Sequence, residues 1–179
     1  MRLLLGGGLA ALCLLVGLQT ETGYASPLVD LQADGKVMIA GRALRCGTVR
    51  NVLDPRLPNL GVAAPGMLVL NPQLLNRQSN TVRLFVYHHE CGHHHVGASE
   101  IAADCWAVKQ GVRQGWLGRQ SLDQICGSFG NRPATPTHPA SADRCASLQQ
   151  CFAGATASTK RQGAAAMRAS SPAMKAFRP

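Results

Sequence analysis

Six of the seven cysteines lie after the apolar leader that contains Cys13, and they constrain the fold of this 179-residue chain more than any other feature. An even number of cysteines in an exported chain is typical of a disulfide framework, so we expect a disulfide-stabilised fold. If residues 140–151 form a helix, Cys145 and Cys151 lie about 9 Å apart along its axis. That spacing is too long for a bond between them, so each must pair elsewhere. The six are Cys46, Cys91, Cys105, Cys126, Cys145 and Cys151.

Export is predicted from the first 25 residues. Their only charges are Arg2 and Glu21, and Leu3–Leu18 is apolar or glycine throughout. Small residues around Ala25 form a plausible cleavage site, which is typical of a signal peptide. The apolar run is shorter than the roughly 20 residues that a membrane span needs, so we expect a periplasmic or secreted protein without a stable span. An uncleaved N-terminal anchor is the alternative.

The rest of the chain divides into a core and a basic tail. Residues 26–151 carry twelve Lys and Arg against eight Asp and Glu, and this length is suited to one α+β domain. Residues 152–179 carry five cations, no acid and little apolar surface, which predicts a disordered tail. The tail is expected to be solvated or to touch anionic surfaces weakly. Nucleic acid is not an expected partner of an exported protein.

Secondary-structure signals change at residue 72. Short apolar runs bounded by Gly and Pro predict two or three strands before it. After it, Ser79 or Asn80 can cap a helix that reaches about Val96, and Ser99 can cap the next, to about Gln114. A short helix over residues 121–126 and a final one over 140–152 are also predicted, with a turn-rich link at 131–139.

Five of the six histidines lie within residues 88–95. The run His89-Glu90-Cys91-Gly92-His93 is an HExxH motif. On a helix, side chains four residues apart lie on one face, so both imidazoles can bind one Zn²⁺ ion. Glu90 would act as general base toward a zinc-bound water. A solvated histidine-rich face would account for His94 and His95 but not for Glu90.

A catalytic zinc ion needs a third protein ligand. Position 99 is serine, which excludes the longer motif with a third histidine there. After the leader the chain has only two glutamates, Glu90 and Glu100. We therefore favour Glu100 as the ligand. The alternative is that Glu100 binds no metal and is present because a carboxylate in the first turn of a helix is stabilised by the helix dipole. Asp104 lies one turn further on, and is either an orienting acceptor for a histidine ligand or the ligand itself.

These motifs resemble the gluzincin metallopeptidases of the HtpX and CAAX-prenyl-protease type. The HExGH core and the run Glu100-Ile101-Ala102-Ala103-Asp104 are also similar to bacterial neutral zinc metallopeptidases. The resemblance implies a minimal zincin-like core in residues 26–151, with short strands followed by an active-site helix and further helices. It assigns one Zn²⁺ per chain to His89, His93 and Glu100, the base to Glu90 and a supporting role to Asp104.

Two later residues extend this resemblance. Thr137-His138-Pro139 matches the histidine–proline motif of the HtpX-type enzymes, which implies that His138 donates a hydrogen bond to the oxyanion. Arg144 would pair with Asp104 or another carboxylate of the site. The His93-to-Glu100 gap is shorter than usual in those enzymes, and their membrane helices have no counterpart here.

The leading hypothesis is therefore an exported zinc peptidase acting on polypeptides. Met67–Leu70 is expected to be an edge strand to which a substrate peptide can add. Cys91 is expected to face away from zinc, toward a disulfide with the following helix. Two other readings stay open: a periplasmic histidine-rich metal-binding protein, and an inactive zincin fold that serves as a binding module.

Overall fold

The computed structural model describes residues 29–32 and 35–170, so the predicted signal peptide lies outside the described residues. Over these two ranges the chain is α+β, with five helices and two small sheets. All strands precede the long helices, as the sequence predicts. Among the described helices, none is long and apolar enough to cross a membrane.

Four strands form a mixed sheet whose order is β1-β4-β6-β5. The central pair is parallel and the two outer pairs are antiparallel. Because β6 has a neighbour on both sides, the prediction that Met67–Leu70 is an edge strand is wrong. The edge is β5, since the turn at Pro65 and Gly66 folds it back along β6. The strands are β1 (Asp30–Leu31), β4 (Arg50–Leu53), β5 (Gly61–Ala64) and β6 (Met67–Leu70).

A separate hairpin is formed by β2 (Val37–Ile39) and β3 (Arg42–Leu44). Its two turn residues, Ala40 and Gly41, have φ values of 50° and 76°. Positive φ at both central residues is what a two-residue hairpin turn of type I′ requires. The hairpin supplies buried side chains to the core beneath the second helix.

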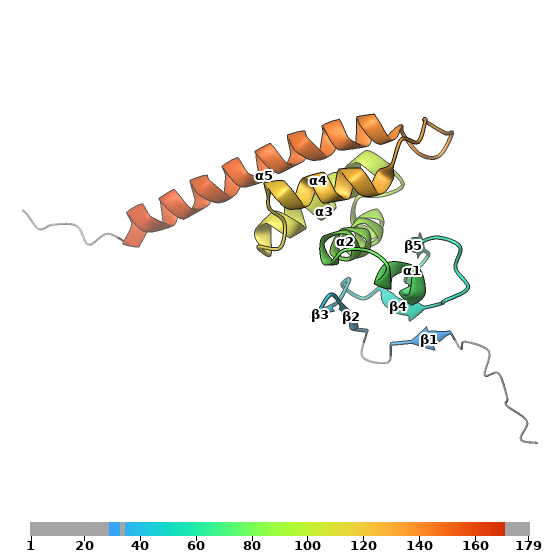
Figure 1. The fold of residues 1–179 in the computed structure, drawn as a ribbon. Coiled ribbons are helices and arrows are strands. Elements are labelled where there is room, and N and C mark those ends of the chain that lie inside the picture. Colours follow the sequence, from blue (N-terminus) through green and yellow to red (C-terminus); the bar gives the residue numbers. More distant parts are fainter. Residues whose placement is uncertain (1–28, 33–34, 171–179) are drawn as a thin grey trace, which may run out of the picture.

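Five helices follow, and the second lies between the strands, with α1 beside them, and the helices α3, α4 and α5 (Figure 1). The predicted caps are confirmed: the side chains of Ser79 and Ser99 accept hydrogen bonds from the backbone of Val82 and Ala102. The helices are α1 (Pro72–Asn76), α2 (Asn80–Val96), α3 (Glu100–Arg113), α4 (Arg119–Phe129) and α5 (Ser141–Ser170).

The core has two parts, one on each side of α2. Leu84, Tyr87 and Cys91 pack against the strands and the hairpin. Phe85 packs with the buried side chains of α3, α4 and α5. Because α2 is packed on both sides, its position is fixed, and the HExxH side chains have fixed neighbours.

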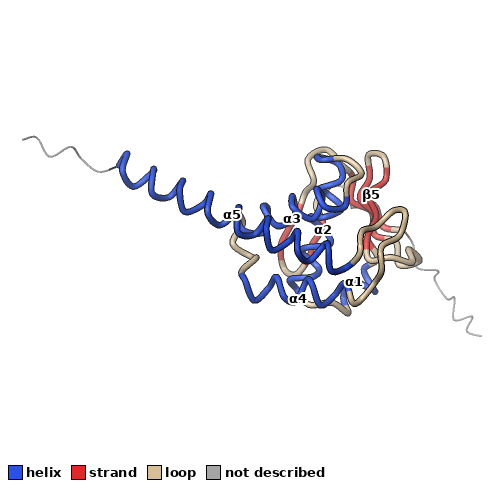
Figure 2. Tube along the Cα trace, turned by 90° about the horizontal axis from the view of Figure 1, so that it is seen from above, coloured by secondary structure: helices blue, strands red, loops and turns tan. Residues whose placement is uncertain are grey.

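Helix α5 is longer than predicted and replaces most of the expected disordered tail. Its first half covers α3 and buries Leu148 and Phe152. The rest projects from the body as a single helix (Figure 2). Alanine is abundant there, and alanine has the highest helix propensity, so the chain continues the helix without burying much apolar surface. Residues 171–179 lie outside the described part.

Within residues 35–170 the structure contains three disulfides: Cys46–Cys91, Cys105–Cys151 and Cys126–Cys145. Cys145 and Cys151 pair with other partners, as predicted. Cys91 is in a disulfide, but its partner lies after the β2–β3 hairpin and not in the following helix. The reason is that Cys91 packs in the same buried cluster as Cys46 and the hairpin, while Cys105 of α3 is bonded to Cys151.

Candidate metal centre

His89 and His93 lie one turn apart on α2, and their Nε2 atoms are 3.1 Å apart. Each ring uses its other nitrogen for a hydrogen bond. Nδ1 of His93 lies 2.9 Å from the Gly97 carbonyl oxygen, and Nδ1 of His89 lies 2.7 Å from Asp104 Oδ1. A hydrogen on Nδ1 leaves the lone pair on Nε2, which is the form of histidine that binds a metal.

Glu100 reaches the two histidines from the first turn of α3. Its Oε2 lies 3.3 Å from His89 Nε2, and its Oε1 lies 3.5 Å from His93 Nε2. The chain reverses between the two helices at Gly97, whose φ of 82° suits glycine, and Ser99 then caps α3. This short connection places Glu100 beside the second histidine.

These three side chains fit a tetrahedral metal. Ligands bound about 2.0–2.1 Å from a tetrahedral zinc ion lie about 3.3 Å from one another, close to the 3.1 Å between the two Nε2 atoms. The two contacts of Glu100 are made by different oxygens, and one donor atom from each of the three residues can be chosen so that all three atoms lie within 4.8 Å of one another. Two imidazoles and one carboxylate are also a known donor set for catalytic zinc. The donor type and the spacing therefore both suit Zn²⁺, with one position left for water or substrate.

Asp104 contacts the His89 ring on the side opposite Glu100. It is fully buried, and its carboxylate is bound in a bidentate manner by Arg144 from α5, at 2.6 and 2.7 Å. It contacts Nδ1 of His89, the nitrogen that faces away from Glu100. Of the two roles left open for Asp104, this position is that of an orienting residue. The expected pairing of Arg144 with Asp104 is present.

The charges of the metal-free site are coupled. Burial opposes protonation of His89, but hydrogen bonds that the protonated ring donates to the Asp104 and Glu100 carboxylates outweigh it and raise the pKa of His89 to about 9. Burial would raise the pKa of Glu100, yet His89 and Arg144 hold it below its ordinary value. Without metal, the site therefore keeps a protonated histidine between two carboxylates.

Glu90 faces the open side of the site, between α2 and β5. Burial raises the pKa of its carboxyl group above the ordinary value. The Ala63 backbone N–H donates a hydrogen bond to it. The fit against the strand is close, because a Cβ added to Gly61 would stand 2.9 Å from Cγ of Glu90. A carboxylate with a raised pKa is a better proton acceptor, as a general base requires.

His138 approaches the same site from the link between α4 and α5. Its Nε2 lies 3.6 Å from Glu100 Oε1, and its side chain is 57% exposed. Thr135 shapes the turn, since its hydroxyl accepts a hydrogen bond from the His138 N–H and its own N–H donates to the His138 carbonyl. The structure thus brings all the sequence-predicted site residues together around one point.

A cleft of about 640 Å³ opens in front of this point. It is bounded by the strand side at Leu60 and Gly61, by α2 at Phe85 and Glu90, and by the link that carries His138. Sequence analysis missed β5 as a wall of the cleft. The signal was present, because Gly61–Ala64 and Met67–Leu70 flank the turn-forming dipeptide Pro65-Gly66.

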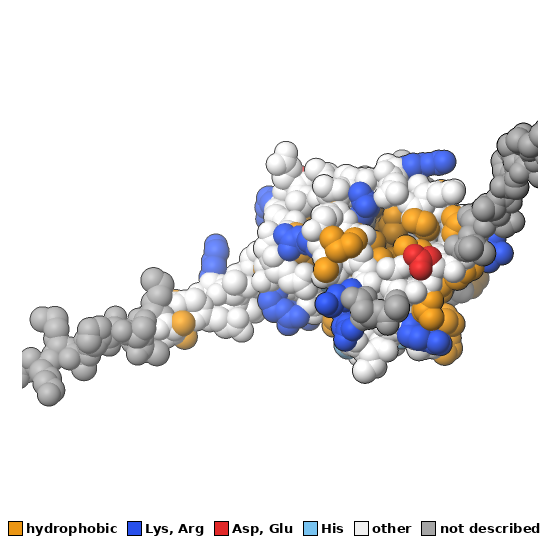
Figure 3. Space-filling view, turned by 90° about the horizontal axis from the view of Figure 1, so that it is seen from below, with side chains coloured by type: hydrophobic (Ala, Val, Ile, Leu, Met, Phe, Trp, Pro, Cys, Tyr) orange, Lys and Arg blue, Asp and Glu red, His pale blue; other side chains and the backbone are white. Residues whose placement is uncertain are grey.

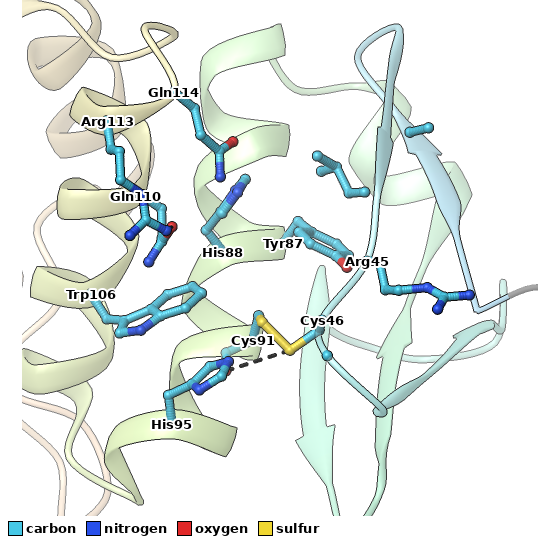
Figure 4. A pocket seen from close by; sticks show the side chains of 13 residues that line it. Arg45, Cys46, Tyr87, His88, Cys91, His95, Trp106, Gln110, Arg113 and Gln114 are labelled. Atoms are coloured by element: carbon cyan, nitrogen blue, oxygen red, sulfur yellow. Dashed lines mark hydrogen bonds between the residues drawn. A yellow bond between two sulfur atoms is a disulfide. The ribbon is translucent and has the colours of Figure 1, made fainter.

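A second cavity, of about 580 Å³, lies on the opposite side of α2 (Figure 4). It is lined by Tyr87, His88 and the Cys46–Cys91 disulfide. Cys46, Cys91 and His95 are close enough to suggest a metal site, but sulfurs joined in a disulfide are not thiolates and cannot act as such ligands. His95 instead stacks on Trp106, with ring centroids 4.8 Å apart.

Comparison of the chain with protein-family models, with curated proteins and with solved structures gives no match in any of the three. The described residues by themselves define a class: an α+β, disulfide-stabilised protein with a partly buried group of two histidines and a glutamate that could hold a metal ion. The activity has to be argued from that group.

Proposed function

We propose that this protein is an exported zinc-dependent metallopeptidase with a zincin-like core, related in its site to the gluzincins. The observation that carries the proposal is the triangle formed by His89, His93 and Glu100, with Glu90 on its open side. A metal store would need ligands, but it would have no use for a carboxylate held beside the open position.

Each residue has a part in the proposed hydrolysis. His89, His93 and Glu100 would hold one zinc ion, which supplies Lewis acidity and makes a bound water acidic near neutral pH. Glu90 takes the proton from the attacking water and passes it to the leaving amine nitrogen. His138 donates a hydrogen bond to the oxygen of the scissile carbonyl as charge develops on it.

The substrate would be held by the edge strand β5. In the β5–β6 ladder, Val62 pairs with Val69, and Leu60 accepts a hydrogen bond from Asn71. Pairing alternates along an antiparallel ladder, so the backbone groups of Gly61 and the carbonyl of Ala63 point to the free edge, where the Ala63 N–H already donates to Glu90. A peptide that adds to this edge is bound through its backbone and lies beside Glu90.

Export is part of the proposal. Three disulfides within the described residues are typical of proteins that mature in an oxidising compartment. The apolar leader supplies the signal for that route, and it lies among residues 1–28, outside the described part. The periplasm or the exterior of the cell is the expected location.

The alternative of a histidine-rich metal-binding protein finds less support. It requires His94 and His95 to join the metal ligands. His94 Nε2 instead lies 3.1 Å from the Met67 carbonyl oxygen, and His95 stacks on Trp106. Both rings are thus occupied away from the triangle.

The test uses purified, disulfide-bonded protein loaded with zinc, and a Glu90→Gln variant treated identically. We expect one zinc per chain in both proteins and cleavage of unfolded polypeptides by the unchanged protein alone. Replacement of the base should reduce turnover by at least 100-fold. Equal cleavage by the two proteins, or none by either at full zinc occupancy, would contradict the proposed function.

A further inference from the structure

Near the candidate metal position, a divalent ion and Arg144 would balance Glu90, Glu100 and Asp104. The cleft is also lined by Arg77, which directly follows α1, and by Arg132, from the link after α4, whose backbone N–H donates a hydrogen bond to the Ser141 side chain. Glu90 and Glu100 are the only acidic residues lining the cleft in the described part of the chain. Two positive charges therefore remain without a balancing carboxylate.

Arg77 lies at the N-terminal end of α2, because it precedes the cap residue Ser79 by two positions. Phe85, one turn before His89, also lines the cleft, and its ring lies 5.9 Å from that of Phe129. The Phe129 ring in turn lies 4.3 Å from the Arg144 guanidinium, so this apolar surface reaches the candidate metal centre. Arg77 and Arg132 are both exposed. A substrate side chain with an apolar stem and a terminal anion fits such a surface.

The direction of a bound peptide follows from the path of β5. At its start, Gly61 contacts Val86, whereas the Met67 carbonyl just after its hairpin turn contacts His94. Strand β5 therefore runs alongside α2 in the same direction. A peptide added antiparallel to β5, the more stable pairing, places its C-terminal part toward the start of α2. Arg77 lies at that end of α2, and Arg132 lines the same cleft.

We propose that Arg77 and Arg132 bind a carboxylate on the C-terminal side of the scissile bond, an inference that rests on the proposed peptidase function. Nine residues of helix separate His89 from Asn80, about 13 Å along the axis. Allowing for the reach of an arginine, the carboxylate lies roughly two to four extended residues beyond the cleaved bond. It is either an Asp or Glu side chain or the free C-terminus of the substrate.

Figure 3 shows that basic side chains are spread over one face of the molecule and along α5, whereas acidic side chains are sparse there. General attraction of acidic peptides to the surface is therefore a competing source of any preference. The test needs an arginine outside the cleft as a matched control. Arg161, exposed on the projecting part of α5 and close to Ser158, is suitable.

The experiment uses a series of quenched-fluorescence peptides that share one neutral sequence. Each peptide carries a single Glu, or a single Gln as its control, at one position between four residues before and four residues after the cleaved bond. Each peptide is made with a free and with an amidated C-terminus. The zinc-loaded protein, Arg77→Gln, Arg132→Gln and Arg161→Gln are compared. Binding of the same peptides to Glu90→Gln protein is measured by fluorescence anisotropy, which does not depend on cleavage.

We expect Glu at two to four residues after the bond to raise kcat/KM and affinity about threefold to tenfold over Gln, and high salt to reduce the gain. Arg77→Gln and Arg132→Gln should each lose most of it, and Arg161→Gln none. If a free C-terminus gives the gain and a Glu side chain does not, the bound group is the terminal carboxylate.

Equal kcat/KM and affinity for the Glu and Gln peptides would overturn the inference. So would a preference for Glu before the cleaved bond, or a preference that remains in both Arg77→Gln and Arg132→Gln. Absence of cleavage by the unchanged protein would count against the peptidase, while the anisotropy data would still test the carboxylate site. A charge-reversed protein with Arg77→Glu and Arg132→Glu should prefer Lys at the same positions.

Discussion

Gly92 and Ala103 are in direct backbone contact where α2 crosses α3. A Cβ added to Gly92 would stand 3.1 Å from the Ala103 carbonyl oxygen and 3.2 Å from its Cα. Both neighbours are main-chain atoms, so they cannot move aside as a flexible side chain would. The close approach holds Glu100 and Asp104 of α3 against the histidines of α2.

Substitution of Gly92 by alanine should therefore weaken the metal site without removing any ligand. We expect the free energy of unfolding to fall by about 1–3 kcal/mol, because the helices must separate to admit the methyl group. Zinc affinity should fall as well. Thermal unfolding and zinc competition titrations measure the two effects, and Gly127→Ala on α4, where an added Cβ meets nothing within 4 Å, is the control. Unchanged zinc affinity in Gly92→Ala would contradict this role for the contact.

Asp104→Asn should reduce zinc affinity about 10- to 100-fold although Asp104 makes no contact with the metal in this arrangement. The amide keeps the shape but loses the charge that orients His89 and pairs with Arg144. The metal-free protein should also lose about 3 kcal/mol of stability, since Arg144 keeps a partly buried charge without its partner. Asp123→Asn, an exposed carboxylate on α4, serves as the control. A loss of zinc as complete as that caused by His89→Ala would instead indicate that Asp104 is a ligand.

Stability of the metal-free protein should depend on pH through His89. Its pKa of about 9 lies above the ordinary value of about 6.5. The stabilising contribution is therefore complete below about pH 6.5 and is lost as pH rises through about 9. Urea unfolding of the metal-free protein between pH 6 and 9.5 measures this loss, and zinc-loaded protein should not show it.

Zinc binding gives an independent check on the same group. The metal requires a neutral imidazole, so binding at pH 7 should release about one proton from His89. Calorimetry in two buffers with different ionisation enthalpies reports that number directly. A binding enthalpy that is the same in both buffers would show that His89 is already neutral.

Much of the helical part could be predicted from local signals. Ser79 and Ser99 were identified as caps because capping depends on residues three positions apart, and the HExxH spacing places two histidines on one face. Since Glu100 follows Ser99 directly, its place in the first turn of α3 was also predictable.

The strand order and the partner of Cys91 could not be predicted in this way. The position of β6 between β4 and β5 depends on pairing between segments that are distant in sequence. The short apolar runs do not indicate which segments pair with one another. The Cys46–Cys91 bond depends on where the β2–β3 hairpin packs. The position of Arg132 in the cleft lining likewise depends on how the link after α4 folds, which brings the Arg132 backbone against Ser141.

The projecting half of α5 should be dispensable for folding. Deleting residues 160–179 should change the free energy of unfolding by less than about 0.5 kcal/mol, because the deleted side chains that are described are exposed. Phe152→Ala, in the packed half, should cost about 3 kcal/mol. Urea unfolding and zinc titration of both variants provide the comparison. A large loss on deletion would mean that the projecting half packs against the body or against a second chain.

Arg144 comes from α5, the last helix of the described residues, and two of the three described disulfides join that helix to α3 and α4. A chain whose synthesis has passed the HExxH motif therefore has its histidines long before it has the cation that neutralises Asp104. The order of synthesis thus imposes a delay: the complete candidate centre forms only after residue 151 has been synthesised and cysteine oxidation has joined α5 to α3 and α4. The proposed hydrolytic activity would therefore begin only after synthesis of the catalytic core is complete.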